Sequence, residues 1–78
     1  MKLTEEQKKH YAAYFADEWH AEKMDWILAK SIDDMYRAQD QLRKTYRTVR
    51  DIIGEEAANA MRDNDPITDE MINMVNGR

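Results

Sequence analysis

The chain has 78 residues, a formal net charge of −4 and no cysteine. The lack of cysteine excludes a disulfide framework and a zinc site built on thiolates, and the net charge argues against electrostatic binding of nucleic acid by the whole chain. Because a chain of this size buries only about 60% of its unfolded surface, we expect one small helical domain over residues 1–78. No apolar run is long enough to span a bilayer and no cleavable signal pattern opens the chain, so a soluble, cytoplasmic protein is expected.

An all-α fold is predicted, and its first helix is expected over about residues 4–29. No glycine precedes Gly54, and the only proline is Pro66. Helix-favouring residues dominate the 53 residues before Gly54. Thr4 is placed to cap this helix, with Gln7 at the capping-box position. At 100° per residue, five aromatic side chains fall within an arc of about 140°: Tyr11, Tyr14, Phe15, Trp19 and Trp26.

This aromatic face is either part of the core or a surface for a partner. We expect Tyr11 and Phe15 to be buried, and Trp19 and Trp26 to stay partly available. Tryptophan and tyrosine dominate the energetics of protein interfaces, and acidic neighbours attract a basic site on a partner protein. The candidate partner-binding residues are therefore Tyr11, Tyr14, Glu18, Trp19, Glu22, Asp25 and Trp26.

A second helix is predicted over about residues 32–53, where an apolar seam repeats at alternating spacings of four and three residues. The seam consists of Leu28, Ile32, Met35, Gln39, Leu42, Tyr46, Val49 and Ile53. It points about 100° away from the aromatic arc, so a break between the two helices is expected, with Ser31 as the new N-cap. A hairpin is thus favoured, and one long bent helix remains the alternative.

Two uses of the seam remain open. In the first, it packs on the aromatic helix within one chain. In the second, it mediates self-association into a homodimer, in which Gln39 pairs with its own copy across a two-fold axis and fixes the register of the two helices. The small size of the chain slightly favours the homodimer.

A basic stripe lies in the same region, because residues 37–54 carry five basic and two acidic side chains. Arg43, Arg47 and Arg50 share one helix face, and Arg37 and Lys44 are near. Guanidinium groups match phosphate geometry, so the stripe is a candidate phosphate-binding site for nucleic acid. The alternative is a solvated face paired with acidic residues such as Glu55 and Glu56.

The remaining elements are two short helices, expected over about residues 55–63 and 68–75. Gly54 is predicted to end the second long helix, and Thr68 to cap the last short one, with Ile67 packing on Ile72. No metal site and no cofactor are predicted, because the sequence lacks the repeated acid–histidine units of di-iron bundles. No catalytic residues and no enzymatic activity are predicted either, since no nucleophile or phosphate-loop motif is present.

The make-up of the chain resembles that of small phage and mobile-element proteins that act by binding a host complex. The resemblance is one of composition, because the chain is short, charged, cysteine-free and rich in aromatic residues. It assigns no residue roles. It implies a non-enzymatic regulator or inhibitor that occupies a surface on a partner, such as a host nucleic-acid-processing or defence complex. The alternatives are a small nucleic-acid-binding regulator that uses the basic stripe, and a structural subunit of a larger assembly.

Overall fold

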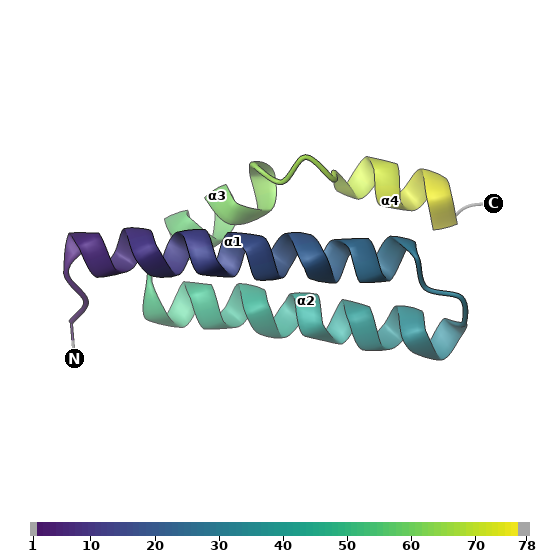
Figure 1. Ribbon diagram of the computed structural model, residues 1–78, viewed down its shortest axis with the longest axis horizontal. Helices are drawn as coiled ribbons and strands as arrows, with labels where there is room; N and C mark the ends of the chain where they lie inside the picture. Colours follow the sequence, from purple (N-terminus) through teal and green to yellow (C-terminus); the bar gives the residue numbers. More distant parts are fainter. Residues whose placement is uncertain (1, 77–78) are drawn as a thin grey trace.

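The computed structural model describes residues 2–76, which form four helices and no strand (Figure 1). In chain order they are α1 (Glu5–Ile27), α2 (Ile32–Ile52), α3 (Glu55–Asp63) and α4 (Asp69–Asn76). The prediction of an all-α fold with two long helices followed by two short ones is confirmed. Helices α1 and α2 fold back on each other as a hairpin, so the alternative of one long bent helix is wrong.

The helix boundaries follow from local capping. The backbone N–H of Gln7 donates to Thr4 Oγ1 at 3.1 Å, and the side chain of Gln7 accepts from the Thr4 N–H at 2.9 Å. At the start of α2, Ser31 Oγ accepts the N–H of Asp34 at 3.1 Å, which confirms the expected break. These caps satisfy backbone donors that have no partner inside the helix.

Gly54 separates α2 from α3. Its φ of +132° lies in a region that side chains with a Cβ rarely adopt, and its N–H donates to the carbonyl of Val49 at 3.1 Å. Only a glycine enters this conformation without strain, so the long helix ends here and the chain turns sharply. As a result, α3 packs back against both members of the hairpin.

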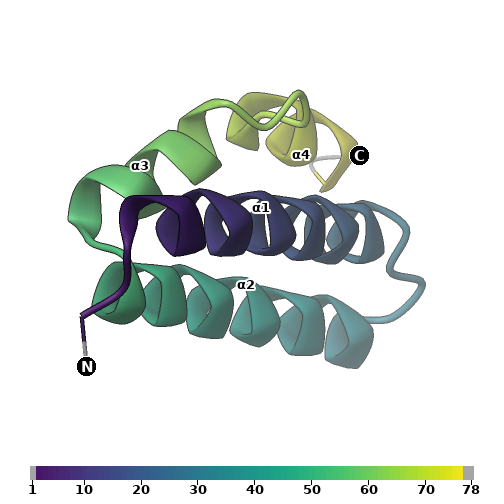
Figure 2. The same ribbon diagram turned by 60° about the vertical axis from the view of Figure 1, so that its left-hand side comes forward.

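The core lies where α3 meets the hairpin. Its buried members are Trp19, Leu42, Val49, Ala58 and Met61, and partly buried side chains from all three helices surround them. Helix α4 packs only on α1, as both ribbon views show (Figure 2). Ile67 and Ile72 anchor this end of the chain, being 8% and 0% exposed.

The expected burial of the aromatic face is partly wrong. Tyr11 is 41% exposed, whereas Trp19, expected to stay available, is only 6% exposed. Phe15 and Trp26 are half-buried. The reason is that α3 packs against the side of α1 that carries Trp19, and the spacing of aromatic residues within α1 carries no information about that contact.

The apolar seam is buried toward its C-terminal end and exposed at its N-terminal end. Leu42 and Val49 belong to the intramolecular core, as expected for the first of the two uses of the seam. Leu28 and Ile32, at the turn between the long helices, are 65% and 67% exposed. Gln39 is half-buried at the edge of the hairpin.

No described helix is long and apolar enough to cross a membrane.

Candidate functional site

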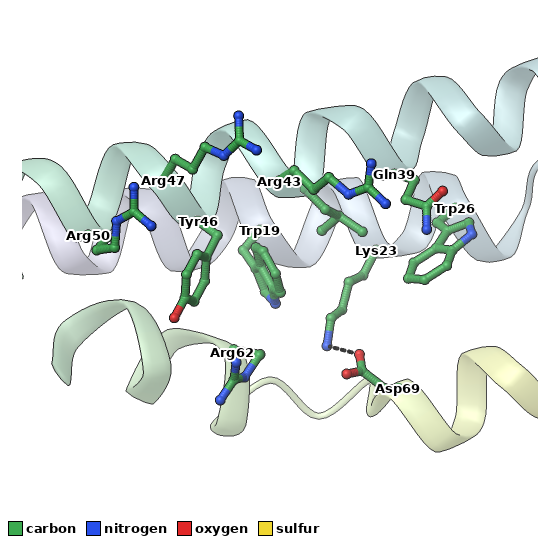
Figure 3. A pocket seen from close by; sticks show the side chains of 11 residues that line it. Trp19, Lys23, Trp26, Gln39, Arg43, Tyr46, Arg47, Arg50, Arg62 and Asp69 are labelled. Carbon is green, nitrogen blue, oxygen red and sulfur yellow. Dashed lines mark ion pairs between the residues drawn. The ribbon is translucent and has the colours of Figure 1, made fainter. Parts of the chain in front are cut away.

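A groove of about 380 Å³ gathers residues from all four helices. In Figure 3 the ribbons of α1 and α2 lie along its upper side and those of α3 and α4 along its lower side. Its cationic side chains are Lys23, Arg43, Arg47, Arg50 and Arg62, and its aromatic side chains are Trp19, Trp26 and Tyr46. We refer to the groove lined by these eight residues as the basic groove.

The spacing along α2 brings three of the arginines to the groove. Arg43, Arg47 and Arg50 are separated by four and three residues, so they share a face of the helix. This face adjoins Leu42, which is 5% exposed in the core. Burial of the apolar seam therefore fixes the rotation of α2 and holds the three arginines at the rim of the groove (Figure 3).

Helix α1 contributes Trp19, Lys23 and Trp26 with the same spacing. Lys23 is 1% exposed, and its ammonium group donates to the backbone carbonyl of Ile67 at 2.7 Å. The carboxylate of Asp69 lies 3.5 Å from the same nitrogen, which itself lies 5.3 Å from the centre of the Trp19 ring. These contacts compensate for the loss of water around a buried charge. Lys23 thus ties the segment before α4 to α1.

The groove arginines have only weak ion-pair partners. Arg43 and Arg50 lie 3.8 and 3.4 Å from acids on their own helix, Asp40 and Asp51, rather than from Glu55 or Glu56. Arg62 lies 3.2 Å from Asp63, the next residue in the sequence. Arg47 forms no ion pair within residues 2–76. Exposed pairs of this kind contribute about 0–1 kcal/mol, so the guanidinium groups are free to bind a stronger anion.

Two indole N–H groups in the groove are unpaired. The Nε1 atoms of Trp19 and Trp26 are both buried, and neither finds an acceptor among the described residues. A buried donor left without an acceptor costs about 1–3 kcal/mol. Tyr46 is different, because its hydroxyl donates to Asn59 Oδ1. Among residues 2–76, Asp69 supplies the only carboxylate that lines the groove, so hydrogen-bond donors greatly outnumber acceptors there.

The other predicted site residues lie outside the groove. Arg37 and Lys44 are exposed on α2 and do not line it. A second surface on α1, which we call the acidic tyrosine face, consists of the exposed residues Tyr11, Tyr14, Glu18 and Asp25. At 100° per residue, this face points roughly 120° away from the groove side of α1. The predicted partner-binding set is therefore divided between two surfaces.

Glu22 belongs to neither surface, because it is half-buried against α2. The hydroxyl of Thr45 donates to its carboxylate, with oxygen–oxygen distances of 2.6 and 2.8 Å. Burial raises the pKa of Glu22, and the nearby charges of Glu18 and Asp25 raise it further, while the bond from Thr45 acts in the opposite direction. Glu22 thus contributes to the contact between the two long helices.

Sequence reasoning missed Lys23, Arg62 and Asp69 as members of the site. Lys23 lies about 40° beyond Trp19 at the edge of the aromatic arc, four residues later in the sequence, and that spacing is a usable signal. Arg62 and Asp69 reach the groove only because of how α3 and α4 pack, which no local pattern predicts. His20 contacts Asp65 at 3.0 Å, and no group of three or more metal-ligating side chains gathers anywhere in residues 2–76.

Comparisons of the chain with protein-family models, with curated proteins and with solved structures find no match.

Proposed function

We propose that this chain is a non-enzymatic binding domain that holds an anionic segment of a partner macromolecule in its basic groove. The observation that carries the proposal is the convergence of five cationic side chains from three helices on one groove with a single carboxylate. A net charge of −4 on the whole chain makes such a concentration of positive charge unexpected unless it serves a purpose.

The chemistry of the groove suits an anionic ligand with several acceptor oxygens. Guanidinium groups donate two parallel hydrogen bonds to a carboxylate or a phosphate, and bonds of this kind are roughly twice as strong as neutral ones. The apolar floor formed by Trp19 and Leu42 lowers the local dielectric constant and strengthens them. A partner whose anionic segment is held in the groove could not use that segment elsewhere, which is how a regulator or an inhibitor would act.

The lining residues support a binding role over a catalytic one. The groove contains no serine, cysteine or histidine, and its carboxylate is held by the ammonium group of Lys23. A reaction of the common acid–base or nucleophilic kinds needs a nucleophile beside a base, or two carboxyl groups with different pKa values. Apart from Asp69 and Gln39, the polar side chains that line the groove are hydrogen-bond donors.

The proposal is tested by binding to generic polyanions at low salt, with heparin, polyglutamate and an oligothymidylate as probes. Arg47→Glu should weaken binding at least tenfold, because a positive charge at the rim of the groove becomes negative. Lys44→Glu makes the same change of charge on the outer face of α2 and should alter affinity about threefold or less. Failure of all three probes to bind, or equal losses in the two variants, would overturn the proposal.

The acidic tyrosine face supports a second function, that of docking on a basic surface of a protein partner. Tyr11 and Tyr14 are 41% and 55% exposed; Glu18 follows Tyr14 by one turn, and Asp25 lies two turns further along the same face. Exposed tyrosines flanked by acid suit a partner with a basic site, such as a nucleic-acid-processing complex. Reversal of Glu18 and Asp25 to lysine should abolish this docking and leave binding in the basic groove intact.

A further inference from the structure

We infer that the anionic segment held in the basic groove is single-stranded nucleic acid, with its phosphates on the four arginines and a base stacked against Trp26. The inference rests on the proposed function and narrows it to one class of ligand. The groove combines the two features that single strands require, a row of cations that follows the backbone and aromatic side chains beside it.

The arginines are arranged to follow a chain rather than to hold a single ion. Arg43, Arg47 and Arg50 are spaced along α2 at intervals of roughly 6 and 4.5 Å. Arg62 comes from α3 on the opposite side of the groove (Figure 3), and its guanidinium carbon lies 5.8 Å from the centre of the Tyr46 ring. The side chains of Arg43, Arg50 and Arg62 are 63%, 48% and 43% exposed, and each lies near one exposed aspartate of its own helix. Arg47 is exposed as well. A backbone with one charge per unit would therefore meet several guanidinium groups in succession.

The aromatic side chains favour nucleic acid over an acidic peptide. A carboxylate side chain offers acceptors but no flat surface, whereas a nucleobase offers both a π-face and ring acceptors. Trp26 is half-buried at the end of the groove, and its indole N–H has no acceptor among the described residues. Trp19, which is 6% exposed, carries a second unpaired N–H beneath the arginines. An acidic peptide would leave the aromatic surface unused.

The surroundings of the groove disfavour a duplex. Its volume of about 380 Å³ lies between helices on both sides. The exposed carboxylates of Asp40, Asp51 and Asp63 stand next to the arginines and would repel a second phosphate backbone. Lys23 is engaged by Ile67 and Asp69, so the arginines provide the phosphate contacts. One strand fits this arrangement better than two.

The test is fluorescence anisotropy with a labelled oligothymidylate of about 12 nucleotides, a length within the range bound by small single-strand sites. If four phosphates are neutralised, the logarithm of affinity should fall with the logarithm of salt concentration with a slope of about −3. Unlabelled duplex of the same length and polyglutamate should compete at least tenfold less well than unlabelled oligothymidylate.

Trp26→Leu provides the discriminating variant, because leucine retains apolar volume and removes the ring. It should weaken oligothymidylate binding several-fold, as expected for the loss of one stacked base, and weaken polyglutamate binding by a clearly smaller factor. Circular dichroism of the variant checks that the helices are retained.

The inference is overturned if polyglutamate or duplex competes as well as the single strand, or if Trp26→Leu leaves oligothymidylate binding unchanged. In those cases the groove still binds anions and the broader proposed function stands. If no polyanion binds at low salt, the proposed function itself fails.

Discussion

The basic groove and the acidic tyrosine face have opposite charge, yet the tryptophans of the groove and the tyrosines of the face come from the same arc of α1. Trp19 and Trp26 lie among cations, whereas Tyr11 and Tyr14 share a helix face with Glu18 and Asp25. The difference arises from the short helices, because α3 and α4 pack on the groove side of α1 and bring Arg62 and Asp69 with them. In a domain this small, the position of a nine-residue helix decides which aromatic residues are core and which are surface.

The largest expected effect is on stability and separates Trp19 from Tyr14. Trp19→Ala should lower the free energy of unfolding by about 3–5 kcal/mol, because it removes a large side chain from the centre of the core. This is a large fraction of the total stability of a small domain. Tyr14→Ala, on the exposed face, should change it by about 0.5 kcal/mol or less. Urea denaturation followed by circular dichroism measures both.

Equal losses in the two variants would contradict the assignment of Trp19 to the core. Where Trp19→Ala fails to fold, Trp19→Phe keeps an aromatic ring at the site and should still be less stable than the wild type. Tyr14→Phe provides the matched change on the exposed face.

The next effect is on affinity and concerns the one carboxylate in the groove. Asp69→Asn should strengthen oligothymidylate binding by several-fold and up to about tenfold, because it removes a negative charge 3.5 Å from Lys23. Asp25→Asn makes the same chemical change on the acidic tyrosine face and should have little effect. Titrations at matched ionic strength compare the two variants, and a similar gain in both would mean that only net charge matters.

A smaller effect concerns Glu22, which lies between the two long helices. Its pKa is raised in the folded state, mainly by burial, so the folded protein holds this proton more tightly than the unfolded chain. The associated stabilisation is present below the ordinary glutamate pKa and is lost as pH rises through the raised value. Ionised Glu22 is therefore less well accommodated near pH 7.

Glu22→Gln keeps an acceptor for Thr45 and removes the charge. It should raise the Tm near pH 7 by less than about 5 °C, and the gain should vanish near pH 4, where Glu22 itself is protonated. Thermal unfolding at the two pH values measures this. A gain that is larger at pH 4 than at pH 7 would contradict the role of burial.

Local features of the fold were predictable, and contacts between distant segments were not. Thr4, Ser31 and Gly54 mark helix ends because capping depends on neighbours a few residues away. The exposure of Tyr11 and the burial of Trp19 were predicted the wrong way round, because both depend on where α3 packs.

The candidate site was predictable in the same partial way. The stripe formed by Arg43, Arg47 and Arg50 follows from helical spacing within α2. Its meeting with Trp19 and Trp26 was not foreseen, because the two sets lie on different helices and only the hairpin brings them together. Arg62 carries no sequence signal for the site, since its role depends on the turn at Gly54 that folds α3 back.

The most direct test of the groove as a single-strand binding site is an NMR titration of the ¹⁵N-labelled protein with oligothymidylate. The chain contains two tryptophans, so its two indole N–H signals report on Trp19 and Trp26 alone. We predict that both indole signals and the side-chain signals of the groove arginines shift during the titration, while the backbone signals of Tyr11, Tyr14, Glu18 and Asp25 stay in place. Shifts confined to the acidic tyrosine face, or unchanged indole signals at saturating oligonucleotide, would contradict the account.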